Sequence, residues 1–192
     1  MGRTQLPVWV CPVLKLTIEL TYAACCLLCA VAGAVFDMTS RRVPNFVTLP
    51  AICFGLLLHW IFGSWLQLGG AAAAGLICGS VFLLFYLAGG MGGGDVKLIA
   101  AAGCISGLSL VGPLLILTSV SGGAMALGLA LYHRRLKETM LNIGALAVHH
   151  RMEGLVPHPI LNMSDPRSVR LPYAVAIATG SALSLLLLAV QR

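Results

Sequence analysis

The sequence predicts an all-helical protein that crosses a membrane about six times, and three observations support this. Hydrophobic residues make up 59% of the chain and charged residues 9%, a composition that a small soluble core cannot bury. The mean hydropathy is +0.96. The apolar residues fall in runs of about 20, the length a helix needs to cross roughly 30 Å of hydrocarbon. We therefore expect one membrane domain over residues 1–192.

All six spans are expected to be helices, because a helix satisfies its own backbone hydrogen bonds in lipid. The predicted spans are 16–36, 47–66, 70–88, 97–112, 113–131 and 173–190. The fourth is short, and only the segment Ser106 to Pro113 separates it from the fifth, so it is open to tilting or to fusion with its neighbour. The first apolar run is long and follows only Arg3 and Lys15, which argues against a cleavable signal peptide.

The basic residues predict the orientation of the chain. Nine of the twelve lysines and arginines fall in the first, third and fifth connections: Arg41, Arg42, Lys97, Arg134, Arg135, Lys137, Arg151, Arg167 and Arg170. Basic residues concentrate in cytoplasmic loops. We therefore expect these connections in the cytoplasm and both termini outside it.

The fifth connection, about 132–172, is long for a compact domain. It holds Leu136, Met140, Ile143 and Ala147 at helical spacing, which predicts a short amphipathic helix resting at the membrane surface. His149, His150 and His158 follow, but adjacent residues splay apart on a helix and no nearby acid completes a site. No metal, cofactor or nucleic acid is expected as a partner.

The seven cysteines fall mostly inside apolar runs, where cysteine behaves as a small hydrophobic residue. Cys26 and Cys29 form one CxxC pair, and no second pair completes a zinc set. We interpret the cysteines as packing residues.

Two of the six acidic residues, Asp37 and Asp95, stand at the ends of long apolar runs. A carboxylate near the hydrocarbon region is costly and marks a functional site by default. Two spans lie between the two aspartates, so the predicted topology places both on the cytoplasmic face. Two close carboxyl groups cannot both ionise cheaply, and such a pair can share one proton, with one member acting as base and the other as acid.

Glycines surround the second aspartate in the segment Gly89-Gly90-Met91-Gly92-Gly93-Gly94-Asp95. Glycine adopts backbone conformations closed to other residues and lets another chain come close. We therefore expect Gly92, Gly93 and Gly94 to form a substrate-binding surface.

These segments resemble two motifs of the type IV prepilin peptidases, which are GxGD aspartic membrane proteases. The segment FDMTSRRVPN, residues 36–45, is similar to the family's first aspartate motif, and GGMGGGDVKL, residues 89–98, is similar to its second. The resemblance implies a bacterial inner-membrane endopeptidase, with Asp37 and Asp95 as catalytic residues, that removes the leader of prepilins and pseudopilins on the cytoplasmic side.

Larger members of that family carry an extra cytoplasmic segment with two CxxC pairs and methylate the new pilin terminus. This sequence looks closer to the short Tad-type enzymes that process Flp pilins, which implies cleavage without methylation.

Five residues near the aspartates allow simpler explanations. Lys97 is a candidate for substrate binding, although topology alone explains a basic residue there, as it does for the two arginines after Asp37. Pro44 shapes the turn that follows the first helix. Asn45 is expected to cap the second helix.

Other functions fit the same features. An ion or proton transporter or channel uses membrane aspartates as relays, and a noncatalytic subunit of a pilus machine needs no particular carboxylate. A GxGD protease of the signal-peptide-peptidase type shares the second motif, but its first motif has tyrosine before aspartate, where this chain has Phe36. The sequence does not define the oligomeric state.

Overall fold

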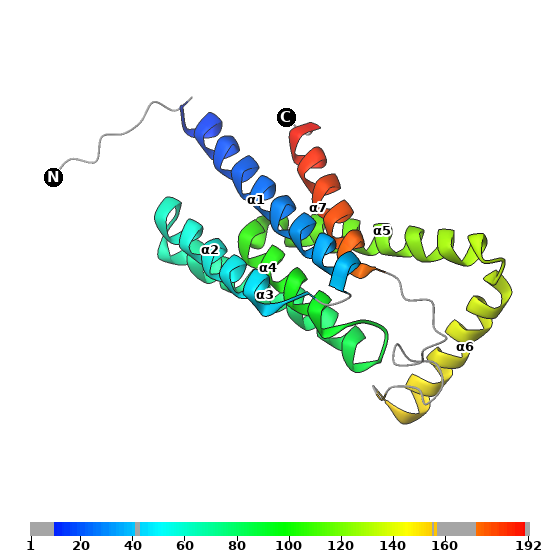
Figure 1. Cartoon of the computed structure of the whole chain (residues 1–192). Coiled ribbons are helices and arrows are strands. Elements are labelled where there is room, and N and C mark those ends of the chain that lie inside the picture. The colour runs from blue at the N-terminus through cyan, green and yellow to red at the C-terminus, as the bar shows by residue number, and fades with distance from the viewer. Residues whose placement is uncertain (1–9, 41–42, 155, 157–171, 191–192) are drawn as a thin grey trace.

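The computed structural model describes residues 10–40, 43–154, 156 and 172–190, and the fold there is helical, as predicted (Figure 1). The elements are α1 (Val10–Ser40), α2 (Asn45–Phe62), α3 (Trp65–Leu87), α4 (Gly93–Ser106), the 3₁₀-helix η1 (Leu108–Leu110), α5 (Val111–Tyr132), α6 (Leu136–Glu153) and α7 (Tyr173–Val190). Of the described helices, α1, α2, α3, α5 and α7 are long and apolar enough to cross a membrane.

The predicted boundary between the second and third spans was wrong. The second span was expected to reach residue 66, but α2 ends at Phe62. Ser64 then begins the next helix, because its hydroxyl accepts a hydrogen bond from the Gln67 N–H at 3.4 Å. Because the residues on both sides of this turn are apolar, hydropathy alone does not locate the break between the two helices.

The predicted fourth span, 97–112, does not correspond to one helix. Helix α4 has 14 residues, which gives a length of about 21 Å. It stops at Gly107, whose φ of +72° leaves the helical region. The next long helix begins at Val111, and Pro113 is tolerated in its first turn. Residues 111 and 112 therefore belong to α5.

Helix α4 lies at the centre of the bundle and contacts α1, α2, α3 and α7. Nine of its 14 residues are buried. Small residues allow this close approach: a Cβ added at Gly103 would lie 2.9 Å from the Ala74 carbonyl oxygen and 2.9 Å from the Cys78 sulfur. The buried side chains of Leu98 and Ile99 extend the same core.

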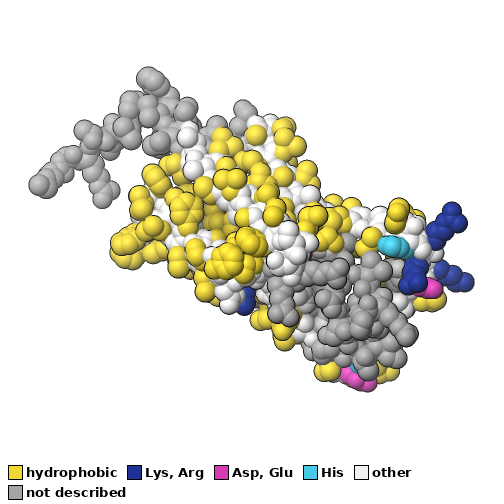
Figure 2. All heavy atoms as spheres, in the orientation of Figure 1, with side chains coloured by type: hydrophobic (Ala, Val, Ile, Leu, Met, Phe, Trp, Pro, Cys, Tyr) yellow, Lys and Arg dark blue, Asp and Glu magenta, His cyan; other side chains and the backbone are white. Residues whose placement is uncertain are grey.

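Helix α7 connects α5 to the rest of the bundle, because it packs against both α1 and α5. One stripe of α5 is buried, formed by Val111, Leu114, Thr118 and Gly122. The rest of α5 extends away from the other helices and leads into α6 (Figure 1). The exposed surface of the body is largely hydrophobic, as expected for lipid contact (Figure 2).

The predicted helix in the fifth connection is present as α6, none of whose residues is buried. Its apolar side chains, including Met140, Leu141 and Ile143, are exposed. Basic side chains gather at the end of the molecule where α5 meets α6 (Figure 2). The predicted amphipathic character was wrong, because the apolar side chains of α6 are spread around the helix and do not form one face.

The contact between α5 and α7 depends on one glycine. A Cβ added at Gly180 would lie 2.6 Å from both Cα and N of Thr118, and this backbone cannot yield easily. We expect Gly180→Ala to lower the free energy of unfolding by about 1–3 kcal/mol, measured by thermal unfolding in detergent. Gly123→Ala is the matched control, because nothing lies within 4 Å of its added Cβ. Equal stability of the two variants would contradict this packing.

Candidate active site

Asp37 is carried by the last turns of α1. The helix continues to Ser40, and the Thr39 hydroxyl donates a hydrogen bond to the Val35 carbonyl at 2.8 Å. The Asp37 side chain is half-buried. Helical backbone therefore sets the direction of this carboxyl group.

Asp95 is the third residue of α4 and is only 6% exposed. Gly89, with a φ of +79°, reverses the chain after α3. The backbone then reaches Gly92, whose carbonyl accepts a hydrogen bond from the Asp95 N–H at 3.2 Å. The Oδ1 atom of Asp95 is buried and has no hydrogen-bond partner among the described residues. This oxygen is therefore shielded from solvent without a compensating hydrogen bond, which disfavours the charged form of the carboxyl group.

The two aspartates influence each other electrostatically. Asp95 lies before the predicted fourth span, and α4 is not one of the helices long and apolar enough to cross a membrane. Its carboxyl group is therefore outside the candidate membrane spans. Burial raises the pKa of Asp95 from its ordinary 3.8 to about 7, the negative charge of Asp37 adds to the rise, and a hydrogen bond from the Gly92 backbone opposes it. At neutral pH a large fraction of Asp95 therefore carries a proton.

The three glycines before Asp95 lie against different neighbours. A Cβ added at Gly94 would lie 3.1 Å from the Val43 nitrogen, so this glycine admits the chain's own turn between α1 and α2. At Gly92 the nearest atom would be Oδ2 of Asp95, at 3.3 Å. At Gly93 it would be an atom of the Tyr86 ring, at 3.5 Å, an ordinary contact. Of the three, Gly94 is the one packed so closely against another segment that an added Cβ would be crowded.

Lys97 and Asn45 are brought together by the fold. The Lys97 ammonium donates a hydrogen bond to Oδ1 of Asn45 at 2.9 Å. The expected capping role of Asn45 was wrong, because Pro44, with extended backbone, occupies the cap position and Asn45 is the first residue of α2. Arg41 and Arg42 lie outside the described residues.

Tyr173 is the first residue of α7, and the sequence pattern predicts no chemical role for it. It is half-buried against the main core and interacts electrostatically with Asp95. The sequence holds no local signal for this interaction, since 78 positions separate the two residues.

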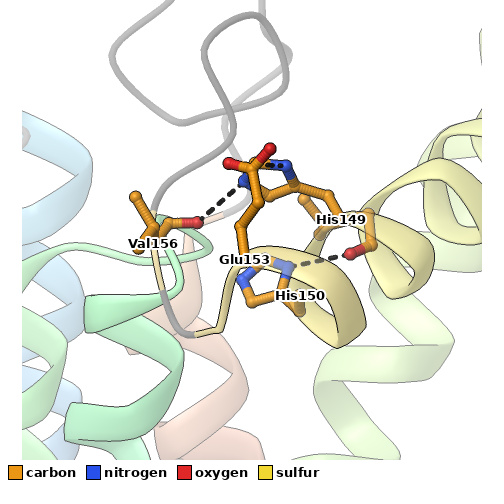
Figure 3. A network of polar contacts seen from close by, with 5 residues as sticks. His149, His150, Glu153 and Val156 are labelled. Atoms are coloured by element: carbon orange, nitrogen blue, oxygen red, sulfur yellow. Dashed lines mark hydrogen bonds and ion pairs between the residues drawn. The ribbon is translucent and has the colours of Figure 1, made fainter.

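The histidines of α6 make local contacts (Figure 3). His149 Nε2 lies 3.2 Å from the Val156 carbonyl oxygen. Its Nδ1 lies 3.6 Å from the Glu153 carboxylate, so an acid is present near the histidines, contrary to the expectation. His150 Nδ1 lies 2.8 Å from the Leu146 carbonyl oxygen. His158 lies outside the described residues. No group of three potential metal ligands occurs in the described part of the chain.

Comparisons with known proteins agree on one family. The model of the type IV leader peptidase family matches residues 22–127, a range that includes both aspartates and the glycine tract. No solved structure gives a significant match.

Three relatives share the printed name prepilin leader peptidase/N-methyltransferase. The protein of Aeromonas hydrophila is 36% identical over 108 residues, which cover 53% of this chain and 37% of the relative. The protein of Burkholderia pseudomallei strain K96243 is 34% identical over 110 residues, covering 52% and 35%. That of Pseudomonas putida is 34% identical over 98 residues, covering 47% and 34%. The matches thus span little more than a third of each relative's length.

The raised pKa of Asp95 predicts a pH-dependent stability. Between about pH 4 and pH 7 the folded protein holds a proton that the unfolded chain releases, so the free energy of unfolding falls as pH rises through this window, by a few kcal/mol in order of magnitude, and is flat above it. Asp95→Asn removes the titrating group, and thermal unfolding in detergent from pH 4 to pH 8 measures the difference. A constant difference between the wild type and this variant would contradict the raised pKa.

Proposed function

Because the chain belongs to the type IV leader peptidase family, we propose that it is a membrane aspartic endopeptidase that removes the leader peptide of prepilins. The observation that carries the proposal is a buried carboxyl group within the electrostatic influence of a second one, on the two segments that resemble the family's aspartate motifs. Such a pair has the two protonation states that peptide hydrolysis needs.

The surroundings of the aspartates support different roles for them. Asp95 is the more buried and holds a proton near neutral pH, so it is the acid that protonates the carbonyl oxygen of the scissile peptide. Asp37 is more exposed and acts as the base that takes a proton from the attacking water. The pair titrates as a unit, and the pH profile of activity is bell-shaped.

The proposed reaction balances without any further reactant. The water oxygen forms a bond to the carbonyl carbon while one water proton passes to Asp37 and the Asp95 proton passes to the carbonyl oxygen. The tetrahedral intermediate then breaks its C–N bond. The leaving nitrogen takes the proton from Asp37, and Asp95 recovers its own as the carboxylic acid product forms.

The substrate peptide needs an extended segment at the reacting bond. In a helix each peptide group is shielded by hydrogen bonds to the neighbouring turns, so the bond to be cut must lie at a helix end or be unwound. Gly92 and Gly93, at the start of α4, offer backbone without side chains next to Asp95. This surface is the proposed contact for the extended segment of the leader.

The cytoplasmic face and the Flp-type substrate belong to the proposal as well. The positive-inside pattern of the connections favours a cytoplasmic active site, with the termini on the opposite side. A substrate anchored by one apolar helix with its leader in the cytoplasm presents basic residues there for the same reason. Cleavage without methylation is proposed from the resemblance to the short Tad-type enzymes. It is in keeping with the sequence's single CxxC pair, of which Cys26 is buried in the core.

The central test is cleavage of a prepilin by the purified protein in liposomes, followed by mass spectrometry. We expect Asp37→Asn and Asp95→Asn each to lower kcat by at least about a thousandfold, because each removes one proton-transfer group. Glu138→Gln is the control, since this exposed acid lies on α6. Cleavage at the wild-type rate by either aspartate variant would reject the mechanism, and proton flux without cleavage would favour a transporter.

Gly94 offers a test of how closely the two segments must approach. The added methyl group of Gly94→Ala would lie 3.1–3.4 Å from Val43 and push the turn away by a few tenths of an ångström, so we expect kcat to fall about tenfold. Gly79→Ala is the matched control, because its Cβ would meet Ala100 at a similar 3.2 Å on a later turn of α4. Equal losses in both variants would show that tight packing alone, not the position of the turn, limits activity.

A further inference from the structure

One side-chain hydrogen bond joins the two segments that carry the aspartates. Lys97, two residues after Asp95, donates to Asn45, eight residues after Asp37. The two partners are 52 residues apart in sequence, and both side chains are exposed. The contact thus crosses from the beginning of α4 to the beginning of α2.

A second contact joins the same two segments on their buried side. The Gly94 backbone lies against Val43, which is only 7% exposed and belongs to the main hydrophobic core. Met91, just before α4, is equally buried in that core. The turn between α1 and α2 is therefore held against the start of α4 by apolar packing inside and by the Lys97–Asn45 hydrogen bond outside.

We propose that Lys97 is a positioning residue, whose hydrogen bond to Asn45 keeps the start of α2 against the start of α4 and thereby keeps Asp37 beside Asp95. The proposal rests on the proposed peptidase function. It gives Lys97 a role different from the substrate binding expected from the sequence, because the structure supplies a protein partner for its ammonium group.

An exposed hydrogen bond of this kind adds little to global stability. Catalysis is more sensitive, since a displacement of about 1 Å between reacting groups can cost on the order of a hundredfold in rate. Loss of the contact should therefore lower kcat while the protein stays folded. A lysine that binds substrate should instead act mainly on KM and independently of Asn45.

A double-mutant cycle on prepilin cleavage separates these roles. We expect Lys97→Met and Asn45→Ala each to lower kcat about tenfold with KM within about twofold, and the double variant to match either single variant. Lys97→Arg, which can still donate to Asn45, should restore most of the rate. Lys137→Met is the control for loss of an exposed lysine and should behave as wild type. Losses that multiply to about a hundredfold, or a raised KM with Asn45→Ala unaffected, would overturn the proposal.

The pH profile adds a readout that simple destabilisation does not move. Asn45→Ala leaves the Lys97 charge in place but removes the hydrogen bond that holds the start of α2 against α4. Asp37 then acts less strongly on Asp95, and the pKa of Asp95 falls. We expect the alkaline limb of the activity profile to move to lower pH in this variant, and an unchanged limb would count against positioning.

The same shift can be measured without substrate. The pH window over which thermal stability falls should also move to lower pH in Asn45→Ala, because it reports the same proton on Asp95. If the wild type cleaves no prepilin, the proposed function fails, whereas this measurement still decides whether the hydrogen bond sets the relation between the aspartates. An unmoved window would overturn the positioning role on its own.

Discussion

The rest of the structure depends on one electrostatic constraint: a buried carboxyl group beside a second acid cannot readily give up its proton. Asp95 meets this condition because it is buried and because Asp37 lies close enough to act on it. The relation exists only while the end of α1 and the start of α4 stay together. Direct packing of α1 on α4 holds them together, and the Val43–Gly94 packing and the Lys97–Asn45 hydrogen bond join the residues after α1 to the start of α4. In the proposed mechanism, the shared proton is thus a property of how two helix ends meet, more than of either residue.

Small side chains allow the short helix that carries Asp95 to occupy the centre. Inside a membrane, helices associate through close packing and not through exclusion of water. Gly75 and Gly103 bring α3 and α4 into backbone contact, with Cys78 and Cys104 filling the space beside them. Cys78 and Cys104 therefore act in packing, as their apolar surroundings indicated, whereas Cys53 is exposed. The result is a helix surrounded by longer ones, with its first turn at the site.

Composition and hydropathy were sufficient to predict the all-helical class and the approximate positions of the helices, because membrane helices leave a strong local pattern. The same pattern could not locate the break at Gly63 and Ser64, where apolar residues continue on both sides of a capped turn. It also could not separate α4 from α5, since the break depends on the backbone of Gly107. The hydrogen bond of Lys97 with Asn45 and the electrostatic interaction of Tyr173 with Asp95 join distant parts of the chain, and no local pattern records them.

The central place of α4 has a consequence for the order in which the protein is made. Asp37 enters the membrane with the first helix, but its partners on α4 are synthesised only after α2 and α3. Until then Asp37 lacks the second acid, and Val43 and Asn45 lack their contacts with Gly94 and Lys97. At that stage the nascent chain lacks the second carboxyl group of the proposed pair. The proposed peptidase site can form only after α4 has packed against α1, α2 and α3.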